Sequence, residues 1–220
     1  MSKVGRKGRL APAAVRAPII FERLRRAYPE AKTALDHTNP YQLIVATILS
    51  AQTTDVRVNL VTPELFRRYP DAWALARAKP SEVEKLIQST GFFRSKTRSI
   101  VGMAQGLVAD HGGEVPRTME ALVALPGVGR KTANVVLGNA FGENQGVVVD
   151  THVTRLSQRL GLTRQTEPAK IEPVLMRLFP RASWALLSHL LIFHGRQICV
   201  ARKPKCPECV LADICPSAKL

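Results

Sequence analysis

The most informative part of the chain is LPGVGRKTANVVL, residues Leu125 to Leu137. Two glycines, Gly127 and Gly129, flank one valine, and Arg130 and Lys131 follow directly before an apolar run. Glycine permits backbone angles that other residues resist, and it leaves no side chain to hold another backbone at a distance. Amides in such a turn can converge on an anion, and the start of a helix near Lys131 adds partial positive charge. The stretch therefore predicts a hairpin that holds one phosphate through Gly127, Gly129 and Arg130.

The charge balance indicates which kind of molecule supplies that phosphate. The chain has 220 residues, with 32 lysines and arginines against 17 acids and a formal net charge of +15. This excess favours a polyanion, DNA or RNA first, although an anionic membrane surface or a ribosomal location would also fit the charge. The alternative for the hairpin is a plain helix–turn–helix corner with glycines for clearance. The basic pair and the overall charge favour a phosphate contact, which positions a duplex but reads no sequence.

Composition and periodicity both predict an all-α chain. Hydrophobic residues make up 45% and aromatic residues only 5%, which suits an aliphatic, helix-rich interior. Apolar residues recur at helical spacing, and only Val147 to Val149 resembles a strand. Capping residues, glycines and prolines set the ends of the expected helices. We expect helices at residues 19–28, 41–52, 58–69, 80–90, 95–112, 118–125, 131–142, 152–162, 168–179 and 183–199.

The sequence gives no sign of a membrane or secretory segment. It contains no apolar run of eighteen residues, and residues 1–18 are basic without a continuous apolar stretch. We expect an intracellular, cytoplasmic protein with no membrane partner. The basic N-terminus is expected to be a mobile arm that touches phosphates, or else a solvated tail.

Two motifs carry a family resemblance. LPGVGRKTA resembles the helix–hairpin–helix of DNA glycosylases of the endonuclease III family, and VDTH, Val149 to His152, resembles the second signature of that family. The resemblance extends from about Asn39 to Cys215. It implies a two-lobed helix–hairpin–helix glycosylase fold, with a helical barrel and an iron–sulfur cluster domain. The expected parts are residues 1–38, a basic arm and helix of the cluster domain; 39–146, the barrel; and 147–220, the cluster domain.

The resemblance also implies a chemistry for Lys131. A base cannot be removed while it is stacked in a duplex, so such an enzyme flips the base out of double-stranded damaged DNA. The family role of Lys131 is to attack the sugar C1′ and form a Schiff base, after which β-elimination nicks the strand. We therefore expect a monomeric, bifunctional DNA glycosylase and abasic-site lyase that removes oxidised pyrimidines. From the residues alone, Lys131 would equally suit a phosphate-binding role.

Asp150 follows three valines, which suggests a partly desolvated carboxylate. By resemblance it is the second catalytic group, which takes a proton from the lysine or stabilises positive charge on the sugar. The alternative is an N-cap for a helix that begins near Thr151, and both roles can hold together. The same resemblance places His152 at the DNA.

The four cysteines of the chain lie near its C-terminus, at Cys199, Cys206, Cys209 and Cys215. A reducing compartment disfavours disulfides, so a cluster of thiols indicates a metal. Zinc sites usually show two close cysteine pairs, and only one is present here. The spacing resembles the [4Fe–4S] ligand pattern of the endonuclease III family, which implies a structural cluster on these residues.

The segment VARKPK between the first two cysteines is basic. Because it is anchored at both ends, Arg202, Lys203 and Lys205 are expected to contact DNA phosphates. The alternative for these three residues is a solvated run of charge.

A flipped base leaves a gap in the duplex, and two stretches resemble the elements that fill it in the family. Gln52 ends an apolar helix in LSAQTTD, and its amide could bond to the orphaned base. Phe92 in TGFFRSK takes the place of the apolar wedge, usually a leucine, while Phe93 is expected to pack inward. The alternatives are a core position for Phe92 and a solvated helix end for Gln52.

Lys131 and Asp150 also distinguish the expected function from two alternatives. The adenine and mismatch-thymine glycosylases resemble this chain but lack the catalytic lysine, so Lys131 argues against a monofunctional enzyme. A non-enzymatic DNA-binding scaffold with a structural metal would not need both Lys131 and Asp150.

Overall fold

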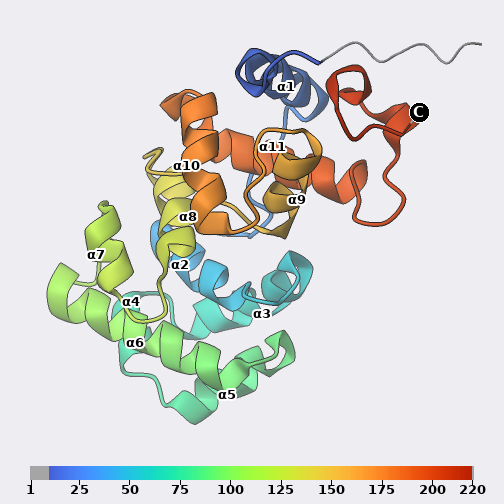
Figure 1. Ribbon diagram of the computed structural model, residues 1–220. Coiled ribbons are helices and arrows are strands. Elements are labelled where there is room, and N and C mark those ends of the chain that lie inside the picture. Colours follow the sequence, from blue (N-terminus) through green and yellow to red (C-terminus); the bar gives the residue numbers. More distant parts are fainter. Residues whose placement is uncertain (1–9, 220) are drawn as a thin grey trace, which may run out of the picture. The chain divides into compact units, whose positions relative to one another are not determined.

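The structure is a computed structural model that describes residues 10–219, and in this range the regular structure is helical throughout (Figure 1). This confirms the predicted all-α class. Val147 to Val149 are buried but form no strand. The chain divides into two compact units, one of which runs from Thr33 to Gln145, while the other combines the chain up to Lys32 with the chain from Gly146 onward. None of the helices in the described range is long and apolar enough to cross a membrane.

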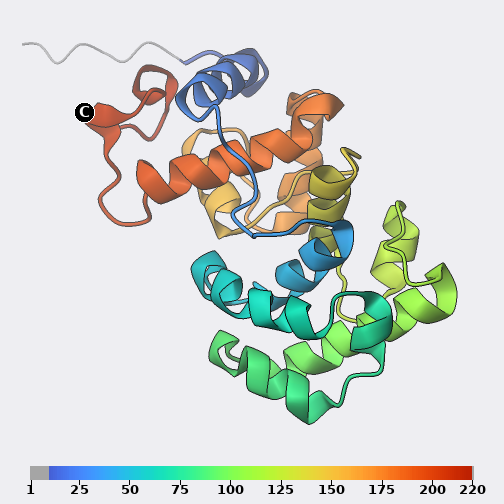
Figure 2. The same ribbon diagram turned by 180° about the vertical axis from the view of Figure 1, so that it is seen from behind.

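The unit from Thr33 to Gln145 is built around α2 and α6. Its helices are α2 (Pro40–Leu49), α3 (Asp55–Arg68), α4 (Ala72–Ala76), α5 (Pro80–Ile87), η1 (Gln88–Thr90), α6 (Phe93–His111), α7 (Met119–Ala124) and α8 (Arg130–Ala140). The side chains of α2 are buried on nearly all sides, as expected for an apolar helix at the centre of a core. In both views α6 runs beside α4 and α5 (Figures 1 and 2).

Local sequence explains where these helices begin and end. Asn39 accepts a hydrogen bond from the Gln42 amide at 2.9 Å, and Pro40 occupies the first helical position of α2. Gly112, with φ of 58°, ends α6 in the left-handed conformation. Helix α4 was not predicted, because five residues capped by Asp71 are too short to show a helical period.

The other unit contains α1 (Ala13–Ala27), α9 (Thr151–Arg159), α10 (Pro168–Leu178), η2 (Arg181–Ser183), α11 (Trp184–Gln197), η3 (Cys206–Glu208) and η4 (Ala212–Ile214). Helix α11 packs against α9 and α1. Helix α1 begins six residues earlier than predicted, because Arg16 and Ala17 already lie on its buried face. The first nine residues of the expected basic arm lie outside the described residues.

The C-terminal segment is tied to α1 within this unit (Figure 2). Arg16 donates to the carbonyl oxygens of Leu160 at 2.6 Å and Ile214 at 3.2 Å. Arg23 forms two hydrogen bonds with the carboxylate of Asp213, one of them 3.0 Å long. These contacts position the segment that carries the cysteines.

Candidate functional site

The glycine hairpin lies between α7 and α8 and is exposed at its tip. Val128 is buried between Gly127 and Gly129, which are both exposed, and its amide donates to the Leu125 carbonyl at 3.1 Å. Helix α8 begins at Arg130 with Gly129 as its N-cap and without a side-chain cap. The exposed Lys131 therefore lies in the first turn of α8, where backbone amides lack intrahelical partners and favour an anion.

The structure constrains the two glycine positions of the hairpin differently. Gly127 has φ of +75°, and a Cβ atom placed there would lie 2.5 Å from Cβ of Ser99. Gly129 has φ of −95°, which any residue adopts, and nothing lies within 4 Å of a Cβ at this position. The fold therefore requires glycine at position 127 but not at position 129.

Asp150 is the N-cap of α9, in the other unit of the chain. Its side chain accepts a hydrogen bond from the Val153 amide at 2.8 Å, and the residue is half-buried after the buried Val147–Val149. The Val148 amide donates to Oγ of Ser188 at 3.0 Å. This bond attaches the segment that precedes Asp150 to α11. The carboxylate thus has a fixed orientation, and the capping role is confirmed.

His152 is half-buried two residues after Asp150. Its Nδ1 lies 3.1 Å from Nη2 of Arg155, and that guanidinium also donates to the Gly195 carbonyl at 2.8 Å. Burial lowers the pKa of His152, with Asp150 opposing the shift and the nearby arginines adding to it. Gly195 allows this approach, since a Cβ there would lie 3.0 Å from Nδ1 of His152.

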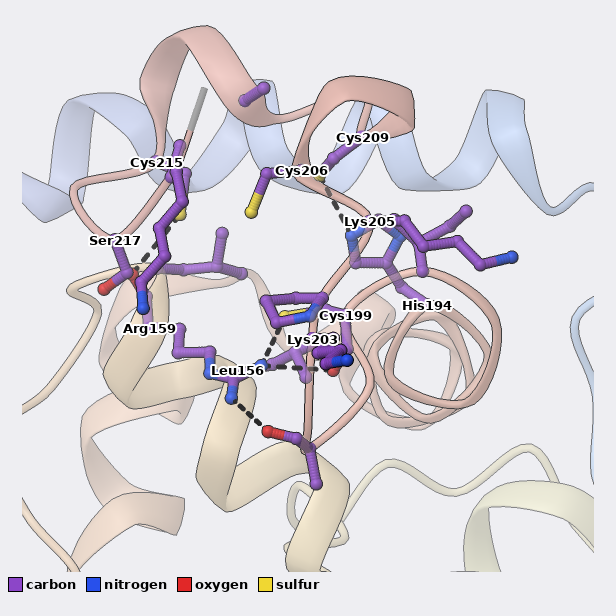
Figure 3. A pocket seen from close by; sticks show the side chains of 17 residues that line it. Leu156, Arg159, His194, Cys199, Lys203, Lys205, Cys206, Cys209, Cys215 and Ser217 are labelled. Atoms are coloured by element: carbon purple, nitrogen blue, oxygen red, sulfur yellow. Dashed lines mark hydrogen bonds between the residues drawn. The ribbon is translucent and has the colours of Figure 1, made fainter.

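The structure brings the four cysteines together around one cavity of about 300 Å³ (Figure 3). Each of the four side chains is half-buried. They surround the space rather than converge on one point, and across residues 10–219 no three His, Cys, Asp or Glu side chains are placed to hold a single ion. Thiolates at the edge of a cavity suit a cluster, in which each cysteine binds its own iron.

The charge of the cavity also fits a metal group. Burial raises the pKa of Cys209 and of Cys215, and the neighbouring cysteines add to the shift in both thiols. Four thiolates therefore disfavour one another here unless a cationic centre compensates them. Cys209 and Cys199 also have donors beside their sulfurs: the Leu211 amide lies 3.4 Å from Sγ of Cys209, and Nη1 of Arg159 lies 3.4 Å from Sγ of Cys199. The residues present fit an iron–sulfur cluster.

The basic loop, residues 200–205, is exposed and held from beneath. Arg202, Lys203 and Lys205 are exposed, and Lys203 has a left-handed φ of 53°. Arg159 donates to the carbonyls of Val200 at 2.8 Å and Ala201 at 2.9 Å, and the Lys205 amide donates to the Ile198 carbonyl at 3.0 Å. The three cations therefore extend from an anchored loop.

Gln52 and Phe92 lie on two loops that line one cavity of about 250 Å³ in the unit from Thr33 to Gln145. Both are exposed, Phe92 by 68%, so Phe92 is not a core residue. Both have left-handed backbones, with φ of 54° and 46°, a conformation that costs a non-glycine residue roughly 1–3 kcal/mol. Gly127 lines the same cavity, which brings the hairpin and these loops together. Phe93 is partly buried against the core, as expected.

Sequence reasoning missed the residues that support these groups. Lys96 is buried beneath the two loops, Arg159 holds the basic loop, and Ser99 faces Gly127. Nothing in the sequence distinguishes Lys96 or Arg159 from an ordinary surface cation of a helix. Lys131 and Asp150 belong to different units of the chain.

Comparisons with known proteins agree with these features. Residues 45–181 match the model of the HhH-GPD superfamily base excision DNA repair proteins, and residues 199–215 match the iron–sulfur binding domain of endonuclease III. An endonuclease III of a Synechocystis species is 56% identical over 219 residues, which cover 100% of this chain and 99% of that protein. The endonuclease III of Bacillus subtilis is 44% identical over 189 residues, 86% of each chain.

Solved structures show the same likeness. A non-covalent endonuclease III–DNA complex and a trapped endonuclease III–DNA covalent intermediate each match with a TM-score of 0.89 at 39% identity. Each match covers 94% of this chain, and 97% and 98% of the respective solved chain. A thermostable thymine-DNA glycosylase shares the fold, with a TM-score of 0.83 at 23% identity over 93% of this chain and 97% of that one.

Proposed function

Because the chain belongs to the endonuclease III family of base excision DNA repair proteins, we propose that Lys131 and Asp150 carry the chemistry of that family in this protein. The protein is a bifunctional DNA glycosylase and abasic-site lyase, which removes oxidised pyrimidines through a lysine Schiff base and cleaves the strand by β-elimination. The observation that supports our assignment is the exposed position of Lys131 in the uncapped first turn of α8, directly after the hairpin tip.

In the proposed reaction, the neutral amine of Lys131 forms a bond with the sugar C1′ of a flipped nucleotide as the bond from C1′ to the base breaks. The base leaves with a proton, and opening of the sugar ring gives the Schiff base. Loss of a proton from C2′ then breaks the bond from C3′ to its oxygen, which nicks the strand. Hydrolysis of the Schiff base returns Lys131. The covalent intermediate trapped in a solved relative supports this sequence.

Asp150 is proposed as the acidic partner of this lysine. Its bond to the Val153 amide fixes the carboxylate at the start of α9, so its direction is set before DNA binds. From there it takes the proton of the lysine or stabilises the positive charge that develops on the sugar. Both roles require a charged carboxylate and predict loss of turnover without loss of binding.

The protein carries a [4Fe–4S] cluster. We propose that its ligands are the four cysteines of the cavity: Cys199, Cys206, Cys209 and Cys215. When bound, the cluster supplies cross-links that hold this segment together in place of disulfides. The chain itself orients the basic loop, because Arg159 donates to the Val200 and Ala201 carbonyls and the Lys205 amide donates to the Ile198 carbonyl.

The protein binds DNA, and we propose how each region contacts it. Double-stranded damaged DNA is the substrate, with the protein acting as a monomer inside the cell. The backbone at Gly127, Gly129 and Arg130 binds one DNA phosphate, and the side chains of the basic loop bind other phosphates of the duplex. His152 lies at the DNA beside Asp150, while Gln52 and Phe92 fill the gap. In this proposal the unit from Thr33 to Gln145 is the barrel domain, which includes residues 33–38 because Leu35 packs in its core, and the other unit is the cluster domain.

The test measures base release and strand cleavage separately on a duplex with one oxidised pyrimidine. Lys131→Gln should abolish both while binding stays close to that of the unaltered protein. Asp150→Asn should lower turnover by about 10²- to 10⁴-fold, the usual contribution of a proton-transfer group, and still bind. Lys85→Gln, at an exposed lysine of α5, is the control and should change neither step. Base release without cleavage by the unaltered protein would indicate a monofunctional enzyme and refute the lysine mechanism.

A further inference from the structure

Lys96 is a cation buried in the unit from Thr33 to Gln145, with only 5% of its surface exposed. It lies in the first turns of α6, and its ammonium points to two neutral oxygens. Nζ donates to Oγ1 of Thr53 at 2.6 Å and to the carbonyl oxygen of Thr90 at 2.8 Å. Burial lowers the pKa of Lys96, because removal from water disfavours the charged ammonium. A buried cation of this kind is costly unless its hydrogen bonds are made.

The two oxygens come from two different loops. Thr53 follows Gln52 directly, and Thr90 precedes Gly91 and Phe92. Thr53 also donates its own hydroxyl hydrogen to the Thr90 carbonyl, so the three groups form a closed set of hydrogen bonds. We call this set the Lys96 bridge, and we call residues 50–54 and 90–93 the two wedge loops. The bridge joins the wedge loops beneath their exposed tips.

The tips of these loops are in a conformation that they would not hold alone. Gln52 and Phe92 both have left-handed backbones, and both side chains are exposed. Strained residues persist only where the surroundings determine their conformation. The bonds of the bridge attach to the residue after Gln52 and to the residue two before Phe92, which is where such a constraint would act.

We propose that Lys96 is a positioning residue for base extrusion, which fixes the two wedge loops in the separation and conformation that let Gln52 and Phe92 enter the duplex together. This inference rests on the proposed function of those two residues. Because Lys96 is buried, it acts through the two loops rather than by contact with the DNA. A lysine serves here because one ammonium can donate to two acceptors from different segments at once. An apolar side chain of the same length would fill the space but lose both bonds of the ammonium, which would leave the Thr53–Thr90 bond as the remaining link of the bridge.

The experiment compares Lys96→Met, which keeps the length of the side chain and removes its donors, with Lys85→Met at an exposed position of α5. Hydrogen exchange of the free, cluster-containing protein should become about tenfold faster in both wedge loops of Lys96→Met, because a bond to a charged group is lost. Single-turnover excision should slow about tenfold on a fully paired lesion and less than about twofold on the same lesion in single-stranded DNA, where no pairing opposes extrusion. Lys85→Met should match the unaltered protein throughout.

A double variant separates positioning from a merely structural role. Adding Gln52→Ala to Lys96→Met should slow paired excision little beyond the slower single variant, because both act on one step. Additive losses, or equal slowing on paired and single-stranded substrates, would overturn the proposal. If Lys96→Met does not fold, Thr53→Val removes, at similar volume, the hydroxyl that accepts from Lys96 and donates to the Thr90 carbonyl, and the same pattern of exchange and excision is expected.

Unchanged exchange in the wedge loops of Lys96→Met would refute the bridge and leave the role of Gln52 intact. Equal losses for Gln52→Ala on both substrates would instead refute the wedge role, and with it the use of the bridge in extrusion.

Discussion

Alanine at Gly127 and alanine at Gly129 should have very different costs, although the two glycines are separated by one residue. At position 127 the new Cβ would lie 2.5 Å from Cβ and 3.1 Å from Cα of Ser99, and φ is +75°. Rotation of the Ser99 side chain does not move these atoms, so α6 or the hairpin must shift. At position 129 the added Cβ meets nothing within 4 Å.

The magnitudes follow from these geometries. A left-handed backbone costs alanine roughly 1–2 kcal/mol, and forcing a methyl group into an occupied space costs about 1–3 kcal/mol. Gly127→Ala should therefore lower the free energy of unfolding by about 2–5 kcal/mol, a fall of about 4–20 °C in Tm for a chain of this size. Gly129→Ala loses about 0.5–1 kcal/mol of helix capping, but it gains about 0.4–1 kcal/mol through the less flexible unfolded chain. Its net effect on stability should stay within about 0.5 kcal/mol.

Binding should reveal the role of Gly129. If a phosphate approaches the backbone there, the alanine methyl keeps it away, and the loss of one charged hydrogen bond should weaken binding by about tenfold. Circular dichroism melts give the stability of each variant, and fluorescence anisotropy with a duplex that carries an uncleavable abasic-site analogue gives its affinity.

Two results would refute this reasoning. A Gly127→Ala variant with the same Tm as the unaltered protein would show that the hairpin does not lie against Ser99. A Gly129→Ala variant with unchanged stability and unchanged affinity would show that no phosphate approaches this position.

Three further predictions concern other parts of the chain. Replacing Arg202, Lys203 and Lys205 by alanine should reduce the slope of log affinity against log salt by up to ~3, and an unchanged slope would leave the loop simply solvated. Gln52→Ala should slow excision more from paired duplex than from single-stranded DNA, measured in single turnovers. Burial lowers the pKa of His189 to about 4 from 6.5. Between these two pH values the imidazole is protonated in the unfolded chain but neutral in the folded protein. The free energy of unfolding should therefore fall as pH drops from about 6.5 towards 4, by up to about 2 kcal/mol at pH 5. His189→Gln should flatten that part of the pH curve in urea denaturation.

The helices could be predicted from the sequence because apolar spacing and caps act locally. Asn39 and Gly112 mark helix ends in the structure as they do in the sequence. Apolar spacing does not predict α4 because this helix is shorter than two turns, and α1 begins before its predicted start because Arg16 is buried through bonds to distant carbonyls.

The candidate site was predictable to the extent that its residues lie in motifs. The cysteines do converge on one cavity, and Asp150 does cap α9. What the sequence could not reveal depends on contacts between segments far apart in the chain. Ser99, on α6, leaves no room for a side chain at position 127, so glycine is required there. Lys96 binds both Thr53, 43 residues away in the sequence, and Thr90, 6 residues away. No periodicity or spacing records such contacts.

The central assignment is that Lys131 is the nucleophile, and the location of the covalent adduct tests it most directly. Borohydride reduces a Schiff base, so it should trap the protein on a duplex that contains an oxidised pyrimidine. Digestion of the trapped complex and mass spectrometry of the peptides should place the sugar remnant on Lys131 alone, and Lys131→Gln should give no adduct. An adduct on another amine, or a full-strength adduct with Lys131→Gln, would contradict the assignment.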